Sequence, residues 1–310
     1  MRPEIAAFIR AVEGPGTEVV TPTDLSLLTT LRVGGSADAL VTVEDEAALL
    51  RVVHATKDAD LPLLVVGRGS NLLVSDAGWD GVVLRLGTGF RGIAIDGRSV
   101  TVGAAEPMPA VAVRTAQAGL AGFEWGAAVP GSTGGGVRMN AGAHGADMSD
   151  SIVSARVLDA RTGSYEDWDH QRLLLGYRTS GLHPWSIVTS VTLALTPGDR
   201  AAILAEIDAI RTWRREHQPL NRPSCGSVFT NPPGESAGAL IERAGLKGAR
   251  IGGAEVSTTH ANFIVTSAGA TAADVEALIA LVTERVAQTA GITLRTEVVR
   301  SGSTEPTGSD

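Results

Sequence analysis

One stretch of seventeen residues, from Val129 to Gly145, limits what this 310-residue chain can fold into more than any other part of it. The stretch contains six glycines, of which Gly134, Gly135 and Gly136 are consecutive. Glycine loses more backbone freedom on ordering than other residues, so this composition indicates positive φ angles or close approach to another group. Clustered N–H groups without bulky side chains suit a flat, anionic cofactor. A plain surface loop is the alternative interpretation.

A second glycine-containing stretch, from Val65 to Asp76, favours the cofactor interpretation. It begins in a continuous apolar run, Pro62–Gly67, which predicts a buried strand leading into a glycine turn. A dinucleotide-binding fingerprint would place a glycine at residue 72 and a helix after it, but Leu72 and a strand-like run stand there. Neither glycine stretch is followed by Lys-Ser or Lys-Thr, which argues against a P-loop.

The composition is that of a globular protein with a sizeable core, and it excludes several classes of partner. Hydrophobic residues make up 44% and charged residues 19%, and the length is enough for two or three domains. A net charge of -8 argues against nucleic acid or an anionic membrane as the main partner. The single cysteine, Cys225, rules out an internal disulfide framework and is compatible with a reducing compartment. We therefore expect a cytoplasmic protein with no membrane segment and no signal peptide.

Apolar periodicity predicts a mixture of helices and strands. Helices are expected at residues 4–13, 44–59, 109–118, 201–215, 236–244 and 272–290. Strands are expected at residues 39–43, 62–67, 81–86, 98–102, 152–158, 187–195, 261–266 and 293–299. The second helix is expected to bury Ala47, Leu50, Val53 and His54.

Several familiar catalytic patterns are incomplete in this sequence. Residues 234–238 match a G-x-S-x-G nucleophile elbow, but two prolines precede them in place of an apolar strand. Ser236 is therefore expected to cap the following helix. The six histidines lack any metal-ligand spacing, so no metal site is predicted. Cys225 has no identifiable base near it in sequence and is expected to be a buried small residue.

Three polar residues are better candidates for chemistry. Arg178 follows Tyr177 between two strand-like runs, Ser227 follows a glycine and precedes an apolar pair, and Glu297 lies in an apolar segment. Each alone is typical of a capped turn, an ion pair or a solvent-facing position. Together they form an arginine, serine and glutamate set from both halves of the chain, which suits a cleft.

Nine short motifs distributed over about residues 29–300 carry a resemblance to a known family. They are Leu31–Gly35, Gly67–Asp76, Val129–Gly135, Met139–Gly142, Gly176–Ser180, Pro223–Phe229, Gly252–Ser257, His260–Phe263 and Thr296–Val298. In these motifs and their order, the chain resembles the UDP-N-acetylenolpyruvoylglucosamine reductases, which are flavoenzymes of peptidoglycan precursor synthesis. The stretches around Arg178 and His260 resemble the shorter type of the family, which lacks an extra loop over the substrate.

The resemblance implies an α+β fold. A FAD-binding domain of the vanillyl-alcohol-oxidase (PCMH) type, in two subdomains, would be joined to a smaller α+β substrate-binding domain. We expect an N-terminal helix in residues 1–22, the FAD-binding domain in 23–198 with its subdomains split near residue 85, the substrate-binding domain in 199–302, and a disordered tail in 303–310. A cluster of Pro, Gly and Asp at residues 197–200 suits that boundary.

The resemblance also implies a cofactor site for non-covalently bound FAD, with NADPH as co-substrate. The pyrophosphate would lie along Gly67–Asn71 and Gly131–Gly135, the two stretches rich in backbone donors. The cofactor-binding residues implied are Gly67, Arg68, Gly69, Ser70, Asn71, Leu72, Pro130, Gly131, Ser132, Gly134, Gly135, Asn140, Gly142 and Val188. No metal is implied.

The implied reaction is reduction of UDP-N-acetylglucosamine enolpyruvate to UDP-N-acetylmuramate, a step in cell-wall biogenesis that serves cell shape and division. NADPH would reduce the flavin and leave, and the enolpyruvate would take hydride from flavin N5. Ser227 would supply the proton, and Arg178 with Glu297 would stabilise the carboxylate. The substrate-binding residues implied are Tyr177, Arg178, Arg214, Gly226, Ser227, Asn231, Asn262 and Glu297. A monomer with no nucleic-acid partner is expected.

Two departures from the family pattern concern the diphosphate of the substrate. Thr230 and His217 stand where lysines are common in the family, and Arg214 or Arg222 is expected to compensate. Two other interpretations stay open. One is a sugar or alcohol oxidase of the same fold class, and the other is a flavin-binding protein without catalysis. Retention of the three candidate catalytic residues argues against the second.

Overall fold

The computed structural model of the chain describes residues 1–302 and divides into two compact units. The first unit contains residues 1–21, 39–67 and 81–213, and the second contains residues 22–38, 68–80 and those from 214 onwards. The second unit thus gathers three separate stretches of the chain, whereas a single boundary at residues 198/199 is predicted from the sequence. The tail predicted for residues 303–310 lies outside the described residues.

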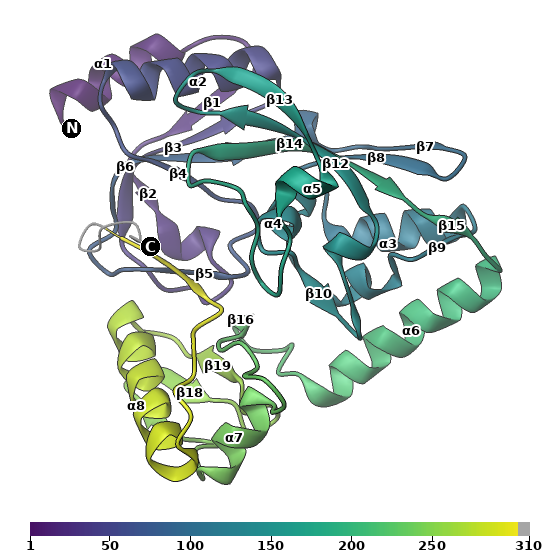
Figure 1. Ribbon diagram of the computed structural model, residues 1–310. Helices are drawn as coiled ribbons and strands as arrows, with labels where there is room; N and C mark the ends of the chain where they lie inside the picture. The colour runs from purple at the N-terminus through teal and green to yellow at the C-terminus, as the bar shows by residue number, and fades with distance from the viewer. Residues whose placement is uncertain (303–310) are drawn as a thin grey trace. The chain divides into compact units, whose positions relative to one another are not determined.

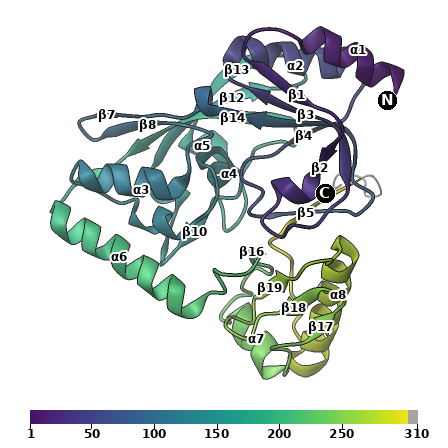
Figure 2. The same ribbon diagram turned by 180° about the vertical axis from the view of Figure 1, so that it is seen from behind.

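The first unit contains two large sheets, of which the first is covered by the N-terminal helices. Its strand order is β1 (Thr17–Val20), β3 (Ser36–Val43), β6 (Trp79–Leu86) and β4 (Leu63–Val65), with β4 parallel to β6. Helices α1 (Pro3–Val12) and α2 (Glu46–Asp58) lie side by side against it (Figures 1 and 2). Their apolar side chains bury against β3 and β6, which explains why both helices are amphipathic.

The buried face of α2 differs from the predicted one. Of the four residues expected to be buried, only Val53 is, while Ala47 and His54 are exposed. The helix instead buries Ala48, Leu49, Val52, Val53, Ala55 and Thr56. Consecutive apolar residues at 47–50 and 52–53 fit two helical phases equally well, and packing against the sheet selects the phase one residue later.

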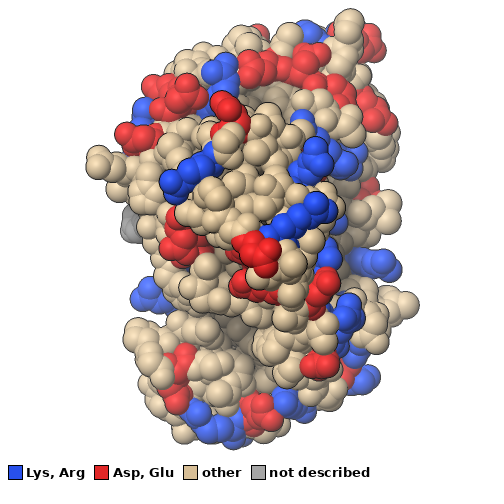
Figure 3. All heavy atoms as spheres, turned by 90° about the vertical axis from the view of Figure 1, so that its right-hand side faces the viewer, with Lys and Arg blue, Asp and Glu red and all other residues tan. Residues whose placement is uncertain are grey.

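Charged side chains of both signs are interspersed over the face drawn in Figure 3. Exposed ion pairs form within each unit, such as Arg161 with Asp159 in the first and Lys247 with Glu242 in the second. Such exposed pairs contribute little to stability individually, but they neutralise each other locally.

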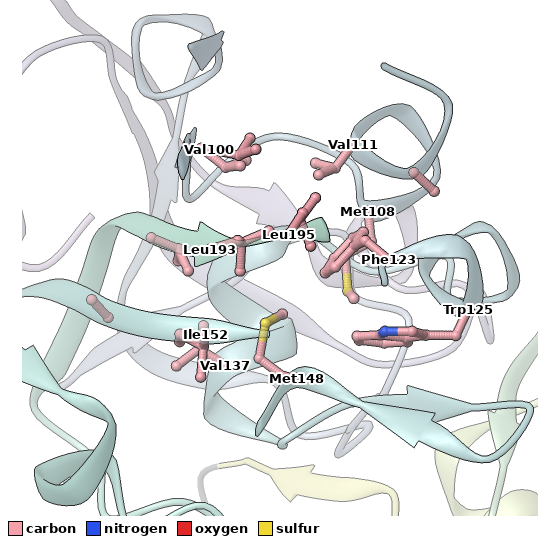
Figure 4. Close-up of a cluster of buried hydrophobic side chains, with 14 of the residues drawn as sticks. Val100, Met108, Val111, Phe123, Trp125, Val137, Met148, Ile152, Leu193 and Leu195 are labelled. Carbon is pink, nitrogen blue, oxygen red and sulfur yellow. The ribbon is translucent and has the colours of Figure 1, made fainter. Parts of the chain in front are cut away.

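The second sheet of the first unit is antiparallel, with the order β13 (Ser164–Asp169), β12 (Ile152–Asp159), β14 (Ser186–Ala194), β8 (Ser99–Gly103) and β7 (Ile93–Asp96). Helix α3 (Met108–Gln117) packs with Phe123 and Trp125 in the core beside it, as Figure 4 shows. Residues Ile203, Ile207 and Ile210 of α6 (Arg200–His217) belong to the same core. The helix predicted to open the second domain therefore packs, over most of its length, in the first unit.

The second unit is built on an antiparallel sheet with the order β16 (Ser224–Ser227), β19 (Phe263–Thr266), β18 (Ala254–Val256) and β17 (Arg250–Ile251). Helices α7 (Ala237–Arg243) and α8 (Ala272–Ala290) pack on it. Helix α8 begins with a capping box of Thr271 and Asp274 and ends at Gly291, whose φ is 69°. A parallel pair, β5 (Leu72–Val74) and β20 (Val299–Ser301), lies beside this core, to which Leu73 contributes.

The strand predicted at residues 293–299 is wrong. The final strand, β20, begins only at Val299, and the preceding residues make one isolated bridge, between Thr296 and Phe229. The amides of Glu297 and Val298 both donate to the carbonyl oxygen of Val228, which interrupts a regular ladder. The predicted strand is therefore divided between two partners. Thr296 pairs with Phe229, and the residues from Val299 onwards pair with β5.

The other predicted helices and strands are present, with ends shifted by a few residues. The remaining short strands are β2 (Thr23–Asp24), β9 (Leu120–Ala121), β10 (Gly142–Ala143), β11 (Ala146–Asp147) and β15 (Thr196–Pro197). The remaining short helices are η1 (Leu25–Leu28), η2 (Thr88–Phe90), η3 (Glu124–Ala128), α4 (Thr133–Arg138), η4 (Met148–Asp150) and α5 (His170–Leu173). Helices packed on largely antiparallel sheets confirm the predicted α+β class. Within residues 1–302, no helix combines the length and apolar character needed to cross a bilayer.

Candidate active site

The two glycine-rich stretches bring backbone segments too close together for side chains. In the first unit, a Cβ on Gly67 would lie 2.4 Å from Oγ of Ser132, the residue that precedes α4. In the second unit, Gly69 has φ +60°, and its Cβ would lie 1.9 Å from the carbonyl oxygen of Leu28. The backbone N–H and the hydroxyl of Thr30 both point to the carbonyl oxygen of Gly69. Both loops are therefore held in fixed conformations that only glycine permits.

Part of the central glycine stretch forms helix α4, which the sequence did not predict. The N–H groups of Thr133 and Gly134 donate to the carbonyl oxygens of Glu106 and Ala104. A Cβ on Gly136 would lie 2.7 Å from the sulfur of Met108. These glycines serve close helix packing, and the N–H of Gly134, implied to bind cofactor, already has a protein partner. Val188, another implied cofactor residue, lies next to Gly134 on β14.

Arg178 lies at the tip of a tight turn in the first unit. Gly176 and Thr179 exchange two backbone hydrogen bonds across the turn, and Arg178 between them has φ 58°. Its guanidinium donates from Nη2 to the carbonyl oxygen of Gly142 at 2.8 Å and from Nη1 to that of Asn140 at 3.5 Å. The guanidinium carbon lies 5.2 Å from the ring centre of Tyr177. The left-handed backbone and the two carbonyl contacts fix the direction of a permanently charged fork.

The backbone segments that carry Ser227 and Glu297 are joined in the second unit, although the two residues are 70 positions apart in sequence. The N–H of Glu297 donates to the carbonyl oxygen of Val228, the residue after Ser227, at 2.7 Å. Gly226, just before Ser227, has φ +77° and lies in β16 at the register shift between Ser224 and Ser227. The side-chain amide of Asn71 donates to the carbonyl oxygen of Glu297 at 3.0 Å. Asn71, an implied cofactor residue, is thus bonded to Glu297, an implied catalytic residue, which is bonded in turn to the residue after Ser227.

Two of the implied substrate-binding residues use their side chains within the second unit. Asn262 is buried, accepting from the N–H of Phe229 at 3.0 Å and donating to its carbonyl oxygen at 2.8 Å. Asn231 accepts from the N–H of Ala237 at the start of α7. Asn262 therefore fixes the segment directly after Ser227, as a neighbouring strand would.

The two arginines expected to replace the missing lysines differ in their surroundings. Arg222 forms an ion pair of 2.5 Å with the buried carboxylate of Glu255, which Arg250 also approaches at 3.0 Å. Arg214 donates from Nε to the uncharged side chain of Gln218 at 2.9 Å, and burial lowers the pKa of its guanidinium. A half-buried cation beside a neutral amide is better suited to an anionic ligand than one already paired.

The alternative catalytic centres weighed from the sequence are not supported by their geometry. Cys225 is 3% exposed, and burial raises the pKa of its thiol to about 12. Ser236 accepts a hydrogen bond from the N–H of Ala239 as the N-cap of α7, which confirms its predicted structural role. Among residues 1–302, no three His, Cys, Asp or Glu side chains are grouped in a way that could hold a metal ion.

Two residues that position this site were missed from the sequence. Asp76 accepts from the N–H groups of Ala272 and Ala273 at 2.7 and 2.9 Å, which attaches the loop after β5 to the start of α8. Arg138 donates to the carbonyl oxygens of His183 and Ser186, near the turn that carries Arg178. The available signal was a charged residue close to the glycines: Asp76 ends the second stretch, and Arg138 follows the three consecutive glycines after Val137.

The comparisons with known proteins agree with one another. A family model described as UDP-N-acetylenolpyruvoylglucosamine reductase, C-terminal domain, matches residues 218–301, and one described as FAD binding domain matches residues 37–167. UDP-N-acetylenolpyruvoylglucosamine reductases of Anaeromyxobacter sp. and Bacillus velezensis are 44% and 42% identical, covering 94% and 87% of this chain and 91% and 89% of their own. The crystal structure of the Thermus caldophilus enzyme matches with a TM-score of 0.79 and 38% identity, covering 92% of this chain and 98% of that one.

The fold and the glycine-lined loops define a flavin-dependent oxidoreductase, because the matched FAD-binding segment spans both glycine-rich stretches. The residues present fit FAD, since the glycines of these stretches carry no side chains that would cover backbone N–H groups, and bare backbone of this kind suits a phosphate. The relatives match almost from end to end. The chain belongs to the UDP-N-acetylenolpyruvoylglucosamine reductase family.

Proposed function

We propose that this chain uses NADPH and bound FAD to reduce UDP-N-acetylglucosamine enolpyruvate to UDP-N-acetylmuramate. The observation that supports it best is the backbone hydrogen bond of 2.7 Å between Glu297 and Val228, which joins the segment of Glu297 to the residue that follows Ser227. A hydroxyl and a carboxylate carried by two joined segments suit delivery of one proton to a carbanion. The family to which the chain belongs supplies the substrate class.

The substrate sets a specific electrostatic demand. Its enol ether is rich in electrons and resists hydride, so negative charge has to move into the adjacent carboxylate as hydride arrives. FAD, when bound, supplies the hydride that it has taken from NADPH. Arg178 is the proposed counter-charge, because its guanidinium is always protonated and already oriented by the carbonyl oxygens of Gly142 and Asn140.

Ser227 is the proposed proton donor to the carbon next to the carboxylate. An alcohol is a weak acid in water, so it can serve only against a strongly basic carbanion in a site that excludes water. Glu297 beside it would stabilise the enolic form or return the proton to the serine. The backbone contacts of Val228 and the paired side chain of Asn262 would keep Ser227 in place during that transfer.

FAD is proposed to be held without a covalent bond by the loops around Gly67–Leu72 and Pro130–Gly135. Among the implied cofactor residues, Gly134, Gly142 and Val188 would act through close packing. Tyr177, Asn231 and Gly226 are proposed to contact the substrate. The chain is proposed to work as a cytoplasmic monomer in the pathway on which cell shape and division depend, and one buried thiol is compatible with that compartment.

Arg214 is the proposed diphosphate contact, ahead of Arg222, because Arg222 is already paired with Glu255. Replacing Arg214 by Ala should raise KM for the UDP substrate by about tenfold, the loss of one charge-assisted hydrogen bond, and leave flavin reduction by NADPH unchanged. A variant with the KM of the unaltered enzyme would contradict this assignment.

Anaerobic stopped-flow absorbance in the flavin band tests the whole proposal. The yellow protein should be bleached by NADPH and then rapidly reoxidised by UDP-N-acetylglucosamine enolpyruvate. In Ser227→Ala the first step should survive and the second should be lost. Reoxidation by oxygen alone would support the sugar or alcohol oxidase alternative. A flavin that stays attached to the protein after acid treatment would be covalently bound and would support the same alternative.

A further inference from the structure

We propose that Asn140 is a positioning residue that sets the direction of the Arg178 guanidinium. The inference rests on the role proposed above for Arg178 in reduction of the enolpyruvate. It gives Asn140 a task other than direct cofactor contact, because its side chain is 2% exposed and its polar atoms face protein groups.

The side-chain amide of Asn140 connects three segments of the first unit. Nδ2 donates to the carbonyl oxygen of Gly176 at 2.9 Å and to Oδ2 of Asp147 at 3.1 Å. Oδ1 accepts from the N–H of Ser149 at 3.0 Å. Gly176 is the first residue of the turn that carries Arg178, so the amide fixes one end of that turn to the hairpin of β10 and β11.

The backbone of Asn140 contacts the same arginine directly. Its carbonyl oxygen lies 3.5 Å from Nη1 of Arg178, while that of Gly142 lies 2.8 Å from Nη2. Asn140 has φ 38°, a left-handed conformation that asparagine and aspartate tolerate better than other side chains. The side chain of Asn140 thus bonds to the first residue of the turn that carries Arg178, and its backbone carbonyl contacts the guanidinium. One residue therefore controls both the start of the turn and one of the two carbonyl groups that hold the guanidinium.

An amide is the only neutral side chain of this size that provides two donors and an acceptor. Aspartate has the same shape and tolerates the same φ, but its carboxylate would face the carboxylate of Asp147 and the carbonyl oxygen of Gly176. Burial and Asp147 would both raise the pKa of the new carboxyl. The other titratable groups near it are Arg178 itself, Asp150, which accepts from the N–H of Asp147, and His170, whose ring lies 3.2 Å from the carbonyl oxygen of Ser149.

Asn140→Asp therefore tests the inference through pH. At pH 8 its flavin should be reduced by NADPH as fast as in the unaltered enzyme, while reoxidation by UDP-N-acetylglucosamine enolpyruvate should be about 30-fold slower. At pH 6 the new carboxyl gains its proton and can donate to Gly176, so the ratio of the two enzymes' reoxidation rates should narrow to about fivefold. Taking the ratio of the two rates at each pH cancels any pH dependence that the two enzymes share.

Two further variants separate positioning from loss of structure. Thr115→Val removes buried side-chain bonds to Val111 and Ala112 in the same unit and should leave both half-reactions unchanged. In an Arg178→Lys background, adding Asn140→Asp should slow reoxidation by less than about threefold, because the group that it positions is already altered.

The outcomes distinguish the two proposals. An unaltered enzyme that the enolpyruvate cannot reoxidise would contradict the proposed function. If the enolpyruvate reoxidises the unaltered enzyme and Asn140→Asp at the same rate at pH 8, the proposed role of Asn140 is overturned. A defect that is the same at pH 6 and pH 8, or one that is fully retained in the Arg178→Lys background, would overturn it too.

Discussion

The side-chain amide of Asn71 donates a hydrogen bond of 3.0 Å to the backbone carbonyl oxygen of Glu297. The N–H of Val299 donates back to the carbonyl oxygen of Asn71, so the two segments are joined in both directions. Asn71 lies in the glycine loop proposed to hold the FAD pyrophosphate, and Glu297 is a proposed catalytic group. The proposed cofactor loop and the backbone of Glu297 are therefore joined by hydrogen bonds within the second unit.

Asn71→Ala should slow flavin reoxidation by the enolpyruvate about fivefold, the effect of losing one neutral hydrogen bond next to Glu297. Reduction by NADPH should change little. Stopped-flow absorbance of both half-reactions measures this. Thr30→Val is the matched control, because it removes a donor to Gly69 in the same loop without touching Glu297. Equal losses in the two variants would mean that Asn71 acts on the loop alone.

Gly69→Ala should weaken FAD binding and destabilise the second unit. Its Cβ would lie 1.9 Å from the carbonyl oxygen of Leu28, at φ +60°. Gly269 has φ +80° with open space around it, so Gly269→Ala reports the cost of the backbone angle alone, about 1 kcal/mol. The collision should add about 1–3 kcal/mol to the free energy lost by Gly69→Ala in urea unfolding. If the two variants lose the same free energy of unfolding, and Gly69→Ala leaves the FAD dissociation constant unchanged, then the close approach of Gly69 to Leu28 is unimportant.

The helices could be predicted because each carries its own signals. Helix α8 has apolar residues at helical spacing, Thr271 and Asp274 at its start and Gly291 at its end, and its predicted range, 272–290, is confirmed. The phase of α2 was wrong because its apolar residues are consecutive, and only the sheet beneath decides which of them are buried.

The candidate site could be predicted as a set of residues but not as a geometry. The motifs gave Ser227 and Glu297 separately, and an interrupted pairing at Val228, with two N–H groups on one carbonyl, brings them together. Such an irregularity leaves no periodic trace in a sequence. The same holds for Asn140, whose partners lie 7 to 36 residues further along the chain and meet only in the folded unit.

Cys225 should be unreactive in the folded protein. It is 3% exposed, and with a pKa of about 12 only about one thiol in ten thousand is ionised at pH 8. A chromogenic disulfide reagent should release colour only after urea is added, and Cys225→Ala should keep both half-reactions. Modification of the native protein with a proportional loss of activity would contradict this and reopen a role for the thiol.

Glu255 should make the stability of the second unit depend on pH. Burial alone would raise the pKa of this carboxyl, but the hydrogen bond from Arg222 and the charges of Arg222 and Arg250 outweigh it, and the pKa lies below its usual range. A carboxyl whose pKa is lowered by folding stabilises the folded state above its unfolded pKa, about 4.3, and loses that contribution as pH falls through the folded value.

Glu255→Gln should therefore reduce the free energy of unfolding by about 1.5–3 kcal/mol at pH 7, the value of hydrogen bonds to a charged group. The difference from the unaltered protein should shrink as the pH is lowered from about 5 towards 3, because the carboxylate then gains its proton. Urea unfolding followed by circular dichroism at a series of pH values measures it. Glu276→Gln, which removes a more exposed ion pair with Arg300, should cost less than about 1 kcal/mol. A difference for Glu255→Gln that stayed constant down to pH 3 would mean that shape, and not charge, accounts for the contribution of this side chain.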